Sequence, residues 1–188
     1  MGKATHTQVG AAGRIIFHGQ TEGGVAPVEE LLASIGAPST VISRIVSVVR
    51  EHMTATSTDG PPSAATVRRL ARRLAPAAMS EWSLVCGADH AGRGVGSGPN
   101  PTTSWLTVAE AAGVDRRPSK LLLGCDDLFA LGHAPGPQYR PVMEAALAAQ
   151  DEGSFTDHAG AGRLAGPDRR RRAPGALSLR RRIKDDSG

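Results

Sequence analysis

Apolar residues recur with a helical period through most of the chain, and this constrains the fold more than any other feature. Val28, Leu31, Leu32 and Ile35 occupy positions i, i+3, i+4 and i+7, which form one face of an amphipathic helix. Alternation with period 2, which is typical of strands, is scarce. Leu, Ile, Val and Phe make up just under one-fifth of the 188 residues, but the net charge of +4 is low for a disordered chain. The pattern predicts an all-α fold, an array of short helices with a thin core.

Turn and capping residues divide the apolar pattern into separate helices. Gly36 and Gly132 are placed to end two of them, and Ser63 is placed to cap a third. The stretches 54–62 and 92–101 are rich in turn residues and predict loops. The side chains predicted to turn inward in the later helices are Ile42, Ile45, Val46, Val49 and Met53; Val67, Leu70, Ala71 and Leu74; Met79, Trp82, Val85 and Cys86; Trp105, Leu106, Val108 and Ala109; Leu128 and Leu131; and Val142, Met143, Ala146, Leu147 and Gln150.

Positive charge is concentrated near the C-terminus. Nine basic residues lie between Arg163 and Lys184, whereas the sequence before them carries more acidic than basic side chains. A run such as Arg169 to Arg172 cannot bury itself, so residues 161–188 are predicted to form a disordered Arg-rich tail. Such a tail either attracts phosphate groups without reading sequence or is simply a soluble terminus.

Composition also excludes several classes of protein. Aromatic residues make up 3% of the chain, too few for the sheet-borne platforms that stack single-stranded bases. Cys86 and Cys125 lie far apart, which excludes a disulfide-dense scaffold and a paired-cysteine metal site. No apolar run approaches the roughly 20 residues that span a bilayer, and no signal-peptide core follows the N-terminus. We expect a cytoplasmic protein with no membrane partner.

Several short motifs, spread along residues 1–153, together carry a resemblance to a known family. The most specific one consists of Leu123-Gly124-Cys125-Asp126-Asp127-Leu128, Leu131-Gly132 and Pro135-Gly136-Pro137, followed by A-Q-x-x-G over residues 149–153. It is similar to a signature of the form L-x-G-x-D-L-x-x-L-G-x-x-P-G-P. Others are the G-R-I-I-F-H-G-Q segment at 13–20, the start Met1-Gly2-Lys3, residues 35–38 and 48–53, the arginine-bearing stretch 67–73 and the pair Ala88-Asp89. Together they resemble the C-terminal half of bacterial CCA tRNA nucleotidyltransferases, the CCA-adding and poly(A) polymerase family with an HD-type helical domain.

The resemblance implies four segments. They are a truncated HD-like helical region over 1–55, connecting helices over 62–93, a C-terminal helical RNA-binding region over 102–160, and the tail over 161–188. The family's nucleotidyltransferase domain and its His-Asp doublet would precede Met1. We therefore expect that the stripes in the first two helices, over 28–35 and 42–49, lack the upstream helices against which the family packs them.

The departures from the family bear on catalysis and metals. The metal-binding Asp-x-Asp pair is missing, so we expect no cofactor for this chain, and Mg²⁺ only for the missing catalytic domain. A family histidine is Gln20 here, and Gln is a poor replacement for imidazole at a transition-metal site. His18 and His52 are the remnant candidates for a metal site; we expect them to be a surface-loop residue and a helix-end residue, with no metal bound.

Two sets of residues are candidates for RNA binding. Arg68, Arg69, Arg72 and Arg73 form a basic strip along one helix, which can follow a phosphate backbone or be a solvated face. Gly136 lies just before a helix predicted to begin at Pro137, so the turn can bind an anion or simply join two helices. Tyr139 and Arg140, one turn on, can add stacking and a charged hydrogen bond. The resemblance implies that these helices hold the body of a tRNA.

The sequence thus predicts the tRNA-binding or RNA-binding C-terminal portion of a CCA-adding type protein, without the catalytic domain. Two alternatives stay open: an HD-type metal-dependent phosphohydrolase, and a non-catalytic partner of a separate nucleotidyltransferase domain. The expected partners are tRNA or another structured RNA, and such a nucleotidyltransferase domain or a second copy of the chain.

Overall fold

Helices account for most of the part of the chain that the structure describes. The structure is a computed structural model that describes residues 7–9, 15–17, 24–57, 60–93 and 98–166. Eight α-helices and one 3₁₀ turn lie within these ranges, and the predicted all-α fold is confirmed. Two three-residue strands, β1 (Thr7–Val9) and β2 (Ile15–Phe17), pair antiparallel near the N-terminus. They were not predicted, because three residues are too few to show alternation.

The chain divides into two compact units, Met1–Lys120 (unit 1) and Leu121–Gly188 (unit 2). The boundary falls inside the segment 102–160, which the family resemblance treats as one region. The helix over Thr102–Ala111 packs with the helices that precede it and so belongs to unit 1.

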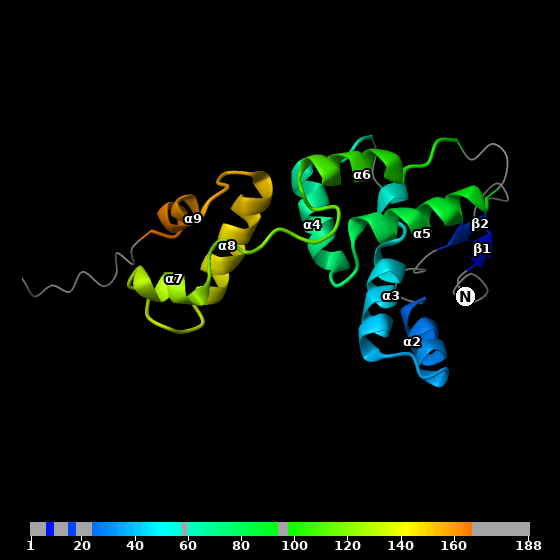
Figure 1. Ribbon diagram of the computed structural model, residues 1–188, viewed down its shortest axis with the longest axis horizontal. Helices are drawn as coiled ribbons and strands as arrows, with labels where there is room; N and C mark the ends of the chain where they lie inside the picture. Colours follow the sequence, from blue (N-terminus) through cyan, green and yellow to red (C-terminus); the bar gives the residue numbers. More distant parts are fainter. Residues whose placement is uncertain (1–6, 10–14, 18–23, 58–59, 94–97, 167–188) are drawn as a thin grey trace, which may run out of the picture. The chain divides into compact units, whose positions relative to one another are not determined.

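Unit 1 contains the longer run of helices. They are α2 (Val25–Ser34), α3 (Ser39–Glu51), the 3₁₀ turn η3 (Thr54–Ser57), α4 (Ala64–Leu74), α5 (Met79–Ala91) and α6 (Thr102–Ala111). Figure 1 shows α2 and α3 as a helical hairpin, with α4, α5 and α6 packed beyond it. The predicted stop at Gly36 is confirmed, since its φ of 72° is a conformation that glycine adopts readily. The predicted cap is also present: the Ser63 hydroxyl accepts the amide hydrogen of Thr66 at 3.1 Å.

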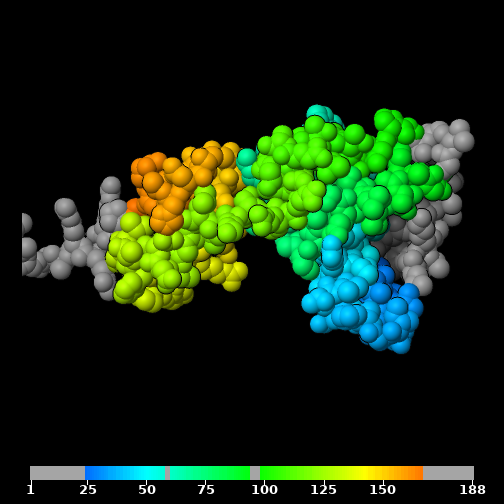
Figure 2. Space-filling model, in the orientation of Figure 1, coloured from blue at the N-terminus to red at the C-terminus, as the bar shows by residue number. Residues whose placement is uncertain are grey.

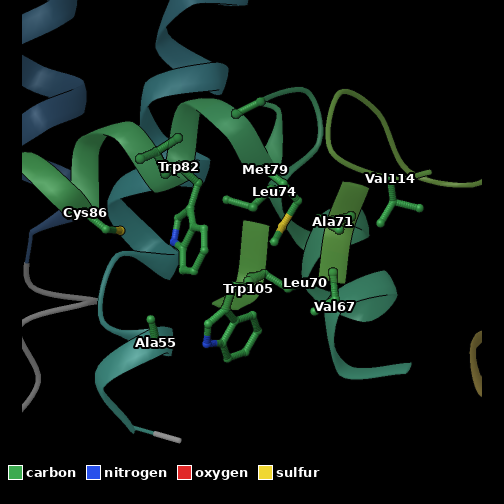
Figure 3. Packing of buried hydrophobic residues seen from close by; sticks show 13 residues of the cluster. Ala55, Val67, Leu70, Ala71, Leu74, Met79, Trp82, Cys86, Trp105 and Val114 are labelled. Carbon is green, nitrogen blue, oxygen red and sulfur yellow. The ribbon is translucent and has the colours of Figure 1, made fainter. Parts of the chain in front are cut away.

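The core of unit 1 is built around two tryptophans. Trp82 and Trp105 are buried and meet edge to face, with ring centroids 5.7 Å apart. Figure 3 shows them among the buried residues of α4 and α5, including Leu70 and Leu74. The Trp82 indole donates to the backbone carbonyl of Glu51 at 2.9 Å, so its polar atom is satisfied inside the core.

One predicted core position of α5 is wrong. Met79, Trp82 and Cys86 are buried, but Val85 is 50% exposed. At about 100° of rotation per residue, Val85 lies roughly 90° or more from the centre of the face that the other three define. Its apolar character alone therefore suggested the wrong orientation.

The α2–α3 hairpin keeps several apolar side chains at the surface. No residue of α2 is buried, and Leu31 and Ile35 are 44% and 70% exposed. Val41 and Ile45 of α3 are also exposed, whereas Val46 and Val48 are buried, so the predicted inward position of Ile45 is wrong. In Figure 2, α2 and the first half of α3 form a lobe that projects from the α4–α6 part of unit 1.

Unit 2 is a small cluster of three helices, α7 (Cys125–Ala130), α8 (Tyr139–Glu152) and α9 (His158–Ala165). Its core consists of the buried residues Leu123, Leu128, Ala146 and Ala161 and the half-buried residues Leu122, Tyr139, Val142, Met143, Phe155 and Ala165. The predicted stop at Gly132 is confirmed by its φ of 86°. The helix predicted from Pro137 begins two residues later.

The prediction that the tail begins at residue 161 is wrong. Residues 161–165 belong to α9, where Ala161 is buried and the Asp157 side chain caps the first turn by accepting from Gly160 N at 2.7 Å. The glycines and alanines of α9 bury little apolar area, so the sequence shows no helical period of large apolar residues there. The remaining tail, 167–188, lies outside the described residues.

None of the helices in the described ranges has the length and apolar character to cross a bilayer.

Candidate nucleic-acid interface

The four arginines of α4 lie on the side of the helix that the core leaves open. Val67, Leu70, Ala71 and Leu74 of the same helix are buried, and this anchors the opposite face. At i and i+4 spacing the arginines form two rows, one of Arg68 and Arg72 and the other of Arg69 and Arg73. The structure therefore contains the predicted basic strip, but the contacts of its members differ.

Arg73 forms an ion pair within the fold. Its Nε and Nη2 atoms donate to the two carboxylate oxygens of Glu51, at 2.9 and 3.2 Å. The Glu51 side chain is 11% exposed. Burial acts to raise the pKa of the Glu51 carboxyl, but the hydrogen bonds from Arg73 and Thr54 outweigh it and hold this pKa below its usual value. Arg73 therefore joins the end of α3 to α4.

Arg72 connects α4 to the segment that follows α6. It is half-buried, and its Nη1 atom donates to the carbonyl of Ser119 at 3.5 Å, at the long limit of a hydrogen bond. Burial lowers the pKa of the Arg72 guanidinium, and the charge of Arg68 lowers it further. Arg68 and Arg72 are thus neighbouring cations on one row.

Arg68 and Arg69 lie in the middle of the helix. Arg69 is exposed and Arg68 is half-buried. In the α4 strip, Arg73 therefore binds a buried carboxylate and Arg72 contacts the backbone of another segment. Arg68 and Arg69 lie toward the middle of the strip. The sequence predicted their common face but could not show which acidic or backbone groups would reach each one.

The second candidate set lies in unit 2 and is held by local contacts. The Tyr139 hydroxyl donates to the carbonyl of His133 at 2.9 Å, and its ring packs against the unit 2 core. Arg140 pairs with Glu144 at 2.8 Å, one helical turn on. A Cβ added to Gly136 would lie 2.5 Å from the Gln138 side-chain amide, which donates to the carbonyl of Ala134. This turn therefore has well-defined internal contacts.

Residues of the specific C-terminal motif hold unit 2 together. Asp127 accepts from the backbone of Gly124 at 2.6 Å and from His158 of α9 at 2.7 Å, and these contacts lower the pKa of its carboxyl. Gln150 of α8 is buried and accepts from the amide of Leu122 at 3.1 Å. These contacts give the motif a structural role in joining α7, α8 and α9.

The remnant metal candidates separate into one described and one undescribed residue. His52 lies just after α3, as expected for a helix-end residue, and its Nδ1 atom is 2.5 Å from the carbonyl of Val49. His18 lies outside the described residues. Within the described ranges, no group of three or more His, Cys, Asp or Glu side chains is arranged to hold a metal ion.

The sequence-based candidates did not include Arg116 and Arg117. They lie between Asp115, whose carbonyl accepts from the amide of Ser80 at 3.1 Å, and Ser119, which contacts Arg72. The signal available in the sequence was the R-R-P-S-K run over 116–120. Without the structure, nothing placed this run beside α4.

Comparison of the chain with protein-family models, with curated proteins and with solved structures finds no match.

Proposed function

We propose that this chain binds structured RNA, tRNA in particular, through the arginine face of α4. It would act as the helical portion of a CCA-adding type protein and add no nucleotides by itself. The observation that carries the proposal is the position of Arg68 and Arg72. These two cations lie one turn apart on the same side of α4, and the opposite face of this helix is buried in the core.

The two cations of this row influence each other electrostatically. Like charges at i and i+4 destabilise a helix by about 0.2 to 0.5 kcal/mol, and burial of Arg72 adds to the cost. Arginines in the last turn gain something from the helix dipole, which offsets this cost at Arg72 but less at Arg68 in the middle of the helix. Phosphate oxygens placed over the row would accept charged hydrogen bonds from its guanidinium groups.

The turn at Gly136 carries less of the proposal. Tyr139 is engaged in the unit 2 core and Arg140 in a local ion pair, so RNA would have to replace these contacts. RNA binding at this turn stays a prediction.

The test is the affinity of the full chain for a fluorescently labelled tRNA transcript, measured by anisotropy over a series of salt concentrations. The variant R68Q/R69Q is compared with R44Q/R93Q. The control removes two exposed cations of unit 1 that pair with Glu81 and Asp89. We expect R68Q/R69Q to bind more weakly and with a smaller salt slope than the control. Equal binding by the two variants would contradict the proposal.

A protein partner is the second candidate function, and the α2–α3 hairpin favours it. Leu31, Ile35, Val41 and Ile45 are exposed. At i and i+4 spacing, Leu31 and Ile35 share one face, and Val41 and Ile45 share one face of α3, so each pair leaves apolar area open to a partner. The candidate partners are a nucleotidyltransferase domain and a second copy of the chain. Sedimentation of wild type and Ile35→Asp, alone and with such a domain, tests this: only wild type should associate.

A further inference from the structure

We propose that the segment between α6 and unit 2 supplies a second row of phosphate contacts, through Arg116 and Arg117, beside the Arg68–Arg72 row of α4. The two rows would form one basic surface for the backbone of double-helical RNA. This inference rests on the proposed function and extends it to a second segment and to a class of RNA.

The fold fixes the path of this segment close to α4. Val114 is buried in the same core cluster as Val67 and Ala71 of α4, and Figure 3 shows it beside Ala71. Asp115 is then held by the amide of Ser80, and Ser119 by Arg72. A chain advances by at most about 3.6 Å per residue, so the backbone of Arg117 lies within about 7 Å of Ser119. By the same count the backbone of Arg116 lies within about 11 Å of Ser119, so both arginines are close in the chain to the residue that Arg72 contacts.

In the described part of unit 1, these two cations lie at the surface. The Arg116 side chain is 89% exposed, and its Nε atom is 3.6 Å from the Asp115 carboxylate. A surface pair at that distance contributes little to stability. Arg117 is also exposed, and Lys120 follows it. Exposed cations such as Arg116 and Arg117 attract an anion that approaches them.

Among the residues whose side chains are described, unit 1 has no exposed aromatic ring on which a base could stack. Both tryptophans of unit 1, Trp82 and Trp105, are buried in its core. Single-strand binding proteins combine cations with exposed aromatic rings, whereas RNA helices are recognised largely through shape, phosphates and 2′-hydroxyls. The combination here fits the backbone of an RNA helix better than it fits unpaired bases.

The test compares R116Q/R117Q with the charge-matched control R44Q/R93Q, in the full chain, on a labelled blunt RNA hairpin. Each phosphate contact contributes about 0.7 to 0.9 to the salt slope, which corresponds to about 5- to 8-fold in affinity at 0.1 M salt. Loss of two contacts should then weaken binding by about 25- to 60-fold and reduce the slope by about 1.4 to 1.8. Oligo(U) of the same length should bind more weakly than the hairpin to wild type and lose less affinity in R116Q/R117Q. Circular dichroism shows whether each variant keeps its helices.

The outcomes separate this inference from the proposed function. If R68Q/R69Q weakens hairpin binding but R116Q/R117Q matches the control, the second row is wrong and the α4 interface stands. If both match the control, both fail. Equal effects on hairpin and oligo(U) would overturn the assignment to double-helical RNA. If R116Q/R117Q weakens binding to phosphatidylserine vesicles but not to the hairpin, the segment faces a membrane and the inference is also overturned.

Discussion

Replacing Arg73 should destabilise unit 1, whereas the same change at Arg69 should not. Arg73→Gln removes both hydrogen bonds to the Glu51 carboxylate and leaves that buried group without its cation. Hydrogen bonds to charged groups contribute about 1.5 to 3 kcal/mol when buried. Because the Arg73 side chain is 50% exposed, solvent screening reduces this toward the 0 to 1 kcal/mol of a surface pair. We expect a loss of about 1 to 2 kcal/mol.

Arg69→Gln is the matched control on the neighbouring turn. Arg69 is exposed, and substitutions of exposed charges usually change stability by less than about 0.5 kcal/mol. Both tryptophans lie in the unit 1 core, so their fluorescence during urea unfolding reports on this unit. With a slope near 2 kcal/mol per molar, Arg73→Gln should lower the urea midpoint by about 0.5 to 1 M.

The pH dependence of this difference supplies a second readout. The pKa of Glu51 is lowered in the folded chain, so the ionised carboxylate stabilises the fold above the unfolded pKa of about 4.3. That contribution is lost as the pH falls through the folded pKa. The gap between wild type and Arg73→Gln should therefore be full near neutral pH and close below about pH 4. An unchanged midpoint in Arg73→Gln, or an equal loss in Arg69→Gln, would refute the assignment of separate roles to the two residues.

Three further predictions concern the packing and the thiols. Leu70→Ala, in the core, should cost about 3 to 5 kcal/mol by the same urea assay, whereas Leu84→Ala, on the exposed side of α5, should cost less than about 0.5 kcal/mol; similar losses would contradict the packing. Burial, with the charge of a nearby carboxylate, raises the pKa of the Cys86 thiol to about 12. Ellman's reagent should therefore label only the exposed Cys125 in the folded chain. The variant Cys125→Ser should abolish that reaction. Gln150→Ala leaves a backbone amide without its acceptor, so it should speed hydrogen exchange across unit 2 by lowering its opening free energy by about 1 to 3 kcal/mol; unchanged exchange would contradict the role of Gln150.

Helices with a strongly apolar face could be predicted from the sequence, because the residues on that face are the ones that pack into the core. The inward residues of α4 and the stops at Gly36 and Gly132 are of this kind. α9 could not be found in this way, because its stability comes from an aspartate cap and small side chains rather than from an apolar stripe.

For the candidate interface, the sequence predicted a basic helix face but not the contacts of the individual arginines. Four arginines at helical spacing revealed a basic face, but their separate roles depend on groups distant in the sequence. Glu51 lies 22 residues before Arg73, and Ser119 lies 47 residues after Arg72. Neither separation carries a local pattern in the sequence.

Photo-cross-linking of the full chain to a tRNA transcript that contains 4-thiouridine tests the proposed interface most directly. Digestion with a protease that does not cleave at arginine keeps the α4 strip within one peptide for mass spectrometry. The account predicts cross-links in peptides that contain residues 68–73 and 116–120, and their loss in R68Q/R69Q. Cross-links confined to residues 131–140 or 167–188, with none in α4, would contradict it.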